Sequence, residues 1–373
     1  MMSKEKIADH EKNNELTEKK DTAEIKTEKK TKNKFLFYTA RTVRGISFFV
    51  ILGILLTVIN YALHPKNNKK EFGMKDQNAH AFYAEPENTI DTLIIGNSEA
   101  YSSFSPLEMW HEYGITSYVS AQGAIIMSEA YYILKEALKT QDPKIVIFET
   151  DALFPHKSDQ TLRDRTISNV IENEISLLKY HDTWKIQKPA NFFSPIEYKW
   201  KSYSRGQMDD PKIEAYGSNF MDISEGKDEE YKDGKINFWI LKYLDKFVDL
   251  CKENNISVIF VTIPNTLTTS RLNSQAVKDY CSGKSITYLD FSEHPEYINI
   301  DWTTDTRDGG VHMNTYGAKK VSDFLGQYIT DNYDIPDRRK DEKLAKRWDS
   351  DYRRYSNRIQ KMEKEMLEEN DMP

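Results

Sequence analysis

The chain has 373 residues, of which 30 % are charged and 39 % are hydrophobic, and its formal net charge is −7. This length suits one large domain or two small ones with a sizeable core. The acidic balance argues against a nucleic-acid binder, which usually carries a basic face. A mean hydropathy of −0.70 excludes a polytopic membrane protein, although such an average can conceal one apolar segment.

The N-terminal region divides into a charged stretch and an apolar stretch. Residues 1–44 contain 12 basic and eight acidic residues, and we expect a disordered tail, because such a composition buries little apolar surface. Residues 45–63 carry no charge and would span roughly 28 Å as a helix, about the thickness of a bilayer core. We predict a transmembrane anchor, with a buried core helix and a cleaved signal peptide as the alternatives.

The distribution of charge predicts the orientation of this anchor. The basic residues before the span favour a cytoplasmic N-terminus in a single-pass protein of the cell membrane, with the rest of the chain extracytoplasmic. Residues 64–373 hold 40 basic and 51 acidic residues. An external domain this acidic does not attract an anionic wall polymer by bulk charge, so such a substrate would need a specific groove.

After a polar linker over residues 64–88, short apolar runs alternate with amphipathic helical segments. The predicted strands are the apolar runs in IDTLIIGNS, TSYVSAQG, PKIVIFETD, ISVIFVTIP and ITYLDFSE. The predicted helices cover residues 105–114, 128–141, 236–255, 273–283 and 314–332, with Ser105, Ser128 and Asn314 as expected N-caps. This alternation predicts an α/β fold over residues 89–335, a three-layer sandwich with a parallel sheet between helices.

Residues 155–234 interrupt the rhythm and read as an insertion with helical pieces around residues 163–187. An insertion at the carboxyl edge of the sheet would form a lid, a substrate wall or a passive excursion. Its aromatic and basic residues form either a sugar-stacking wall or an ordinary surface-to-core patch: Tyr198, Trp200, Tyr203 and Arg205.

Residues 336–373 read as an amphipathic helical tail, because apolar residues recur there at spacings of three and four. These residues are Leu344, Trp348, Tyr352, Tyr355, Ile359, Met362 and Met366. The stripe would dock onto the chain's own domain, self-associate or bind another protein. The two cysteines, Cys251 and Cys281, fall in predicted helices and are either buried thiols or one disulfide.

Two segments carry candidate chemistry. Ser98 follows Gly96 and Asn97 at the end of the first strand, where a serine can act as a nucleophile if a base activates it. His312, in DGGVHMNTYG before the last predicted helix, is the candidate base. Asp308 lies four residues upstream and could orient the imidazole, with Asp305 as the alternative.

The combination of GNS after the first strand and DGGVHMN near the end resembles the SGNH/GDSL hydrolase superfamily over residues 89–332. The resemblance implies a flavodoxin-like sheet, a catalytic Ser98, His312 and Asp308, and an oxyanion hole that includes the backbone N–H groups of Ser98 and Gly123. The third strand ends Glu149-Thr150-Asp151 without the family's Gly-x-Asn-Asp, and Asn97 or Gln122 would have to substitute.

The last block also departs from the family pattern, because Asp308 lies one residue further from His312 than usual. The anchor and the GNSEAYSSFSPLEMW segment look like the membrane-bound arm of the superfamily, which includes DltD-like proteins of teichoic-acid D-alanylation and alginate O-acetylation factors.

The resemblance implies a serine esterase or O-acyltransferase that acts on acetyl or D-alanyl esters of a bacterial cell-envelope glycopolymer. Its partners would be an envelope polysaccharide or teichoic-acid-like polymer and a membrane O-acyltransferase, with no nucleic acid. No cofactor and no metal are implied. The alternatives are a non-catalytic polymer-binding or scaffold protein and an interaction protein that works through its anchor and C-terminal helix.

Overall fold

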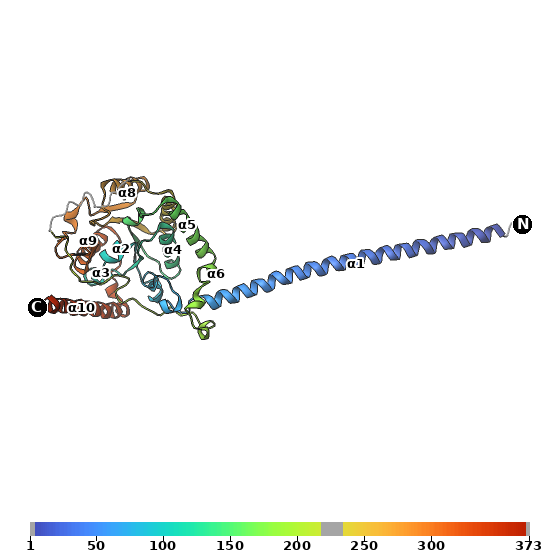
Figure 1. Cartoon of the computed structure of the whole chain (residues 1–373), viewed down its shortest axis with the longest axis horizontal. Helices are drawn as coiled ribbons and strands as arrows, with labels where there is room; N and C mark the ends of the chain where they lie inside the picture. Colours follow the sequence, from blue (N-terminus) through green and yellow to red (C-terminus); the bar gives the residue numbers. More distant parts are fainter. Residues whose placement is uncertain (1–3, 218–233, 371–373) are drawn as a thin grey trace. The chain divides into compact units, whose positions relative to one another are not determined.

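The structure, a computed structural model, describes residues 4–217 and 234–370 and has two compact units, residues 1–62 and 63–373. The described part of the first unit is the long helix α1 (Lys4–Leu63), whose last residue belongs to the second unit (Figure 1). Its C-terminal part is long and apolar enough to cross a membrane, a property that a signal sequence shares. Residues 4–44, which we expected to form a disordered tail, belong to α1, and their Lys- and Glu-rich composition has a high helix propensity.

A five-stranded parallel sheet forms the centre of the second unit, as the alternating pattern predicts. Its strands are β1 (Thr92–Gly96), β2 (Ser117–Ala121), β3 (Ile145–Glu149), β4 (Ser257–Thr262) and β5 (Thr287–Asp290). Their order is β2-β1-β3-β4-β5, the flavodoxin-like order, whose switch point lies between β1 and β3. Ligands of such sheets bind at the carboxyl ends of the strands, where β1 leads into Ser98.

Helices cover both faces of the sheet, because successive side chains of each strand point to opposite sides. In β1, Leu93 and Ile95 belong to one core cluster and Ile94 belongs to the other. The first cluster includes residues of α4 (Met127–Ala137), α7 (Phe238–Glu253) and α8 (Arg271–Lys284). The second includes residues of α2 (Ser98–Ser103), α3 (Pro106–Tyr113) and α9 (Thr315–Asn332). The three-layer α/β sandwich is therefore confirmed.

The predicted helix starts are correct at two positions and wrong at one. Helix α3 begins with Pro106 after Ser105, although the Ser105 side chain makes no capping hydrogen bond. Helix α9 begins after Asn314, whose side chain accepts hydrogen bonds from two backbone N–H groups. Ser128 is not a cap, because α4 begins one residue earlier. The Glu129 carboxylate instead accepts the N–H of Ile126 at 3.1 Å.

The insertion begins with helix α5 (Asp159–Glu174) and the short helix α6 (Ser176–Lys179), within the stretch expected to hold helical pieces. Two 3₁₀ turns follow, η4 (Thr183–Lys185) and η5 (Pro189–Asn191), and the chain then runs without regular structure to residue 217. The remainder of the predicted insertion, residues 218–233, lies outside the described residues.

The C-terminal helix α10 (Glu342–Asn370) docks onto the chain's own domain, one of the three alternatives for the apolar stripe. Trp348 and Tyr355 are fully buried with Trp110 of α3 in a third core cluster. The two indole rings lie 5.3 Å apart. The 336–373 tail is thus packed against the α/β domain through its described residues.

Cys251 and Cys281 are buried free thiols, so the disulfide alternative is wrong. Both residues lie in the core cluster that packs α7 and α8 against the sheet. Burial raises the pKa of each thiol to about 12, which keeps both protonated.

Candidate active site

Ser98 is the first residue of α2, directly after β1. The Asn97 side-chain oxygen accepts the backbone N–H of Glu99 at 2.8 Å, which turns the chain into a helix at the serine. Gly96 is required by close packing, because a Cβ there would lie 2.7 Å from the Cβ of Glu149 on β3. The half-buried Ser98 is therefore held at the carboxyl edge of the sheet.

His312 lies on a small antiparallel hairpin formed by β6 (Thr306–Arg307) and β7 (His312–Met313), which the sequence did not predict. Between these strands, Asp308, Gly309 and Gly310 all have positive φ angles, of 57°, 65° and 86°. This tight loop brings Asp308 back onto the histidine, so that His312 Nδ1 donates to Asp308 Oδ2 at 2.9 Å. The two glycines thus accommodate the extra residue between the aspartate and the histidine.

Asp305, the alternative partner of the histidine, is engaged elsewhere. Its Oδ2 accepts hydrogen bonds from Lys320 Nζ at 2.5 Å and from the backbone N–H of Asp301 at 2.7 Å. Within the described part of the chain, no hydrogen bond joins Asp305 to His312. The geometry favours Asp308 as the residue that orients the imidazole.

Electrostatics keep His312 neutral near pH 7. Burial lowers the pKa of the imidazole below its usual value, and the hydrogen bond to Asp308 opposes this shift while the Arg307 charge adds to it. With Nδ1 donating to Asp308, Nε2 carries the lone pair that a general base needs. Nε2 lies 3.8 Å from Oε1 of Glu99, the residue next to Ser98.

The structure brings Ser98 and His312 to the same edge of the sheet without a hydrogen bond between them, as far as the described residues show. The Ser98 side chain lies against the phenol of Tyr101, one turn further along α2. Catalytic hydrogen bonds are often long or poorly aligned before substrate binds. A rotation of the Ser98 side chain away from Tyr101 is the movement that a reaction would require.

Two buried acids, Glu99 and Glu149, and the half-buried Asp151 surround this pair, and the sequence analysis did not identify them as part of the site. Burial raises the pKa of Glu99, Glu149 and Asp151, and the negative charge of Asp151 raises the first two further. One carboxyl oxygen of Glu99 and one of Glu149 are buried without a hydrogen-bond partner. Arg307, which donates to Ser102 Oγ at 2.7 Å, is the cation beside Glu99. In the sequence, the run Glu149-Thr150-Asp151 at the end of β3 was the signal that could have identified two of these acids.

The proposed substitutes for the missing oxyanion donor are already engaged. Asn97 Nδ2 donates to Asp151 Oδ2 at 2.5 Å, and Gln122 Nε2 donates to Glu129 Oε2 at 3.1 Å. Gly123 lies in the exposed turn after β2, where a Cβ would be 3.8 Å from the Tyr101 hydroxyl. Of the predicted donors, the backbone N–H groups of Ser98 and Gly123 therefore remain.

A groove of about 850 Å³ begins at Tyr101 and Gly123 and is walled by the insertion and α10. Four basic and two acidic side chains line it, in a domain that is acidic as a whole. These charged residues are Lys70, Lys201, Arg354, Arg358, Asp76 and Asp209. Arg354 stacks on the ring of Tyr203 at 4.5 Å, and Arg358 pairs with Asp209 at 2.9 Å. The groove therefore carries a local excess of positive charge.

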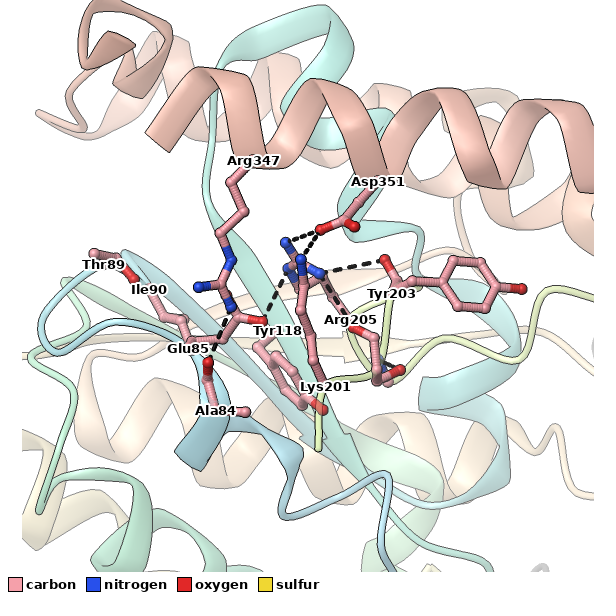
Figure 2. A network of polar contacts seen from close by, with 12 residues as sticks. Ala84, Glu85, Thr89, Ile90, Tyr118, Lys201, Tyr203, Arg205, Arg347 and Asp351 are labelled. Carbon is pink, nitrogen blue, oxygen red and sulfur yellow. Dashed lines mark hydrogen bonds and ion pairs between the residues drawn. The ribbon is translucent and has the colours of Figure 1, made fainter. Parts of the chain in front are cut away.

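A buried ion network holds the α10 wall in place (Figure 2). Arg205 is fully buried and binds Asp351 of α10 at 2.6 Å and Glu85 at 3.4 Å. Arg347 of α10 completes the pairing of Glu85 at 2.9 Å, and Lys201 also binds Asp351. The network ties together the segment before β1, the insertion and α10.

This arrangement separates the four residues suggested as a sugar-stacking wall. Trp200 and Tyr203 line the groove, as a wall requires. Arg205 is buried beneath it and stacks on Trp348 at 4.3 Å. Tyr198 lines a different pocket, where its hydroxyl bonds His64 Nε2 at 2.7 Å.

Comparison with known proteins adds only distant likenesses. No protein-family model and no curated protein matches the chain. Three similar solved structures are a protein of Desulfitobacterium hafniense assigned to the lipolytic G-D-S-L family, a GDSL-like lipase of Bacteroides thetaiotaomicron and the psychrotrophic esterase EstA of Pseudoalteromonas sp..

These three share 10 %, 10 % and 9 % identity with this chain, at TM-scores of 0.37, 0.35 and 0.34. The matches cover 64 %, 68 % and 65 % of this chain and 98 %, 98 % and 97 % of theirs. Because these sequence identities and TM-scores are low, the fold assignment rests on the strand order and on the geometry of the site. Together these define a flavodoxin-like α/β domain with a serine and an aspartate-bound histidine at its carboxyl edge.

Proposed function

We propose that this chain is a serine esterase or O-acyltransferase of the SGNH/GDSL type, anchored in the cell membrane by its N-terminal helix. The observation that carries the proposal is the Asp308–His312 pair, held by the β6–β7 hairpin beside the β1–α2 turn that presents Ser98. A neutral imidazole, oriented by a carboxylate and placed near a serine at a ligand-binding sheet edge, suits acyl transfer.

The chemistry follows from these positions. His312 Nε2 removes the proton from the Ser98 hydroxyl as its oxygen attacks the ester carbonyl, and Asp308 stabilises the resulting imidazolium. The ester C–O bond then breaks, and the alcohol leaves with the proton from His312. Water or a second hydroxyl group, deprotonated by His312, releases the acyl group from Ser98. Backbone N–H groups of Ser98 and Gly123 would hold the oxyanion.

The proposed substrate is an acetyl or D-alanyl ester on a bacterial cell-envelope glycopolymer, either a polysaccharide or a teichoic-acid-like chain. The groove that begins beside Tyr101 supports this proposal through its size, its aromatic wall of Trp200 and Tyr203 and its basic side chains. The domain would be extracytoplasmic, with the N-terminus in the cytoplasm and a membrane O-acyltransferase as the partner in transfer. The 12 basic residues among the first 44 support this topology.

Labelling with a fluorophosphonate probe tests the catalytic proposal, because the probe reacts with activated serines. The wild-type chain in detergent should label, Ser98→Ala should not, and the matched control Ser282→Ala, at an exposed position of α8, should label like the wild type. A folded wild type that does not label, or a Ser98→Ala variant that still does, would contradict the proposal. Release of acyl groups from isolated polymer, with and without added acceptor, then separates hydrolysis from transfer.

The second candidate function is a non-catalytic polymer-binding protein that assists a membrane acyltransferase. Two observations favour it: the Ser98 side chain lies beside Tyr101 and makes no hydrogen bond to His312 among the described residues, and β3 ends in Glu149-Thr150-Asp151, without the family's Gly-x-Asn-Asp. This function requires the groove but not the serine. It predicts that Ser98→Ala retains full polymer binding and full support of polymer acylation in cells.

A further inference from the structure

A segment of the insertion, residues 175–196, is fixed to the point where the apolar helix ends. Thr183 Oγ1 donates to the carbonyl oxygen of Leu63, and Gln187 Nε2 donates to the carbonyl oxygens of Leu63 and His64 at 3.1 and 3.3 Å. Just beyond the segment, the backbone N–H of Glu197 donates to the Lys66 carbonyl at 2.9 Å. Whatever surrounds the end of the apolar helix is therefore close to this segment.

The segment exposes an unusual number of large apolar side chains. Six of them are between 38 % and 68 % exposed: Ile175, Leu178, Trp184, Ile186, Phe193 and Ile196. Single exposed apolar residues are ordinary, but a concentration within 22 residues indicates an interaction surface. Tryptophan, with an apolar ring and a polar N–H, is enriched where a protein meets the membrane–water interface.

The same segment is basic in an acidic domain. It contains Lys179, Lys185 and Lys188 and one acidic residue, Asp182. The Lys185 ammonium lies over the Trp184 ring, 5.9 Å from its centroid. A positive charge and an exposed aromatic ring are therefore neighbours on this surface. Surfaces that bind anionic lipids typically combine lysines with apolar and aromatic residues.

Lys179 also lines a pocket of about 220 Å³, and the side chains around this pocket carry an excess of positive charge. Lys75 and Lys139 line this pocket with it, and Glu136 is the one carboxylate among its lining residues. Lys179 Nζ donates to the neutral Asn173 Oδ1 at 2.7 Å, and no carboxylate of the described residues lies within 4 Å of it. Burial and the charges of Lys139 and Lys75 lower the Lys179 pKa, which a bound anion would reverse.

We propose that residues 175–196 form a docking surface for anionic phospholipid, with the six apolar side chains in the interfacial layer and a headgroup phosphate at Lys179. The proposal rests on the membrane anchor of the proposed function, because the anchor brings this surface to the bilayer. The surface would hold the domain against the lipid beside the point where the anchor ends.

Fluorescence quenching by lipids with brominated acyl chains tests this surface, since bromine quenches only tryptophans near the bilayer. The full chain, which has six tryptophans, is reconstituted into phosphatidylglycerol vesicles and floated to confirm insertion. Quenching should drop sharply in Trp184→Phe and stay unchanged in the matched control Trp239→Phe, a half-buried residue of α7. Phe193→Trp, added to Trp184→Phe, should restore the quenching.

The outcomes separate the two proposals. A chain that does not float with the vesicles refutes the membrane anchor. A chain that floats but is quenched equally with and without Trp184 refutes the docking surface and leaves the anchor intact. Quenching should also be at least twofold stronger in phosphatidylglycerol than in phosphatidylcholine, and neutralising Lys179, Lys185 and Lys188 to Gln should remove that difference. Equal wild-type quenching in both lipids would refute recognition of the anionic headgroup.

Discussion

The carboxylate of Asp308 allows a sharp test of the site, because one of its oxygen atoms serves two donors. Oδ2 accepts from His312 Nδ1 at 2.9 Å and from Arg307 Nη1 at 3.2 Å. In Asp308→Asn the amide oxygen should take this position, since the NH₂ group would face two N–H donors. The variant therefore keeps the imidazole tautomer and removes only the negative charge.

The expected losses follow from this geometry. A hydrogen bond to a charged group contributes about 1.5–3 kcal/mol, roughly twice a neutral one. Because the Asp308 side chain is 44 % exposed, we take the lower part of that range. Removal of the charge then costs about 1 kcal/mol, or about fivefold in kcat/KM. Asp308→Ala also releases the orientation of the ring, and we expect a loss of about 2 kcal/mol, or about 30-fold.

Hydrolysis of p-nitrophenyl acetate by the full chain in detergent measures both values, with thermal melting as the control for folding. An Asp308→Asn variant less active than Asp308→Ala would show that the amide reverses the tautomer and that the shared-oxygen argument is wrong. Unchanged kcat/KM in both variants would remove Asp308 from the site.

Three further outcomes are expected. Because the base must be neutral and burial lowers the pKa of His312, kcat/KM should fall on acidification only below pH 6.5, and a midpoint at or above that pH contradicts the assignment. Trp348→Ala should lower the free energy of unfolding by about 3–5 kcal/mol in urea titrations, since the indole is fully buried; a loss under about 1 kcal/mol would refute tight docking of α10. Cys251 and Cys281 should react with Ellman's reagent only after unfolding, and fast reaction of the native chain would contradict their burial.

The parallel sheet could be predicted because its strands are short apolar runs separated by amphipathic helices, a pattern that follows directly from burial on both faces. Ser98 and His312 could be placed at one edge for a related reason: one follows a strand and the other precedes the last helix. The Asn314 cap was readable as well, since its amide oxygen satisfies the N–H groups of Tyr316 and Gly317.

Features that depend on contacts distant in sequence were not readable. The β6–β7 hairpin has two residues per strand, too few for any periodicity. The negative charge of Glu149 raises the pKa of Glu99 only because β1, which leads into Glu99, and β3 are neighbours in the sheet. The prediction of Ser128 as the N-cap was wrong because α4 begins one residue before it. The carboxylate of Glu129 accepts the backbone N–H of Ile126 at the start of this helix. Docking of α10 depends on the pairing of Trp348 with Trp110, 238 residues away.

The position of α10 in the chain affects the order in which the site is completed during synthesis. Arg358, in the groove wall, follows Ser98 by 260 residues. At about 5–20 residues per second, roughly 13 to 50 seconds separate translation of the two. The serine therefore exists well before the groove that would select its substrate. Until α10 packs against Arg205 and Trp110, the nascent domain has a sheet edge but only one side of its groove.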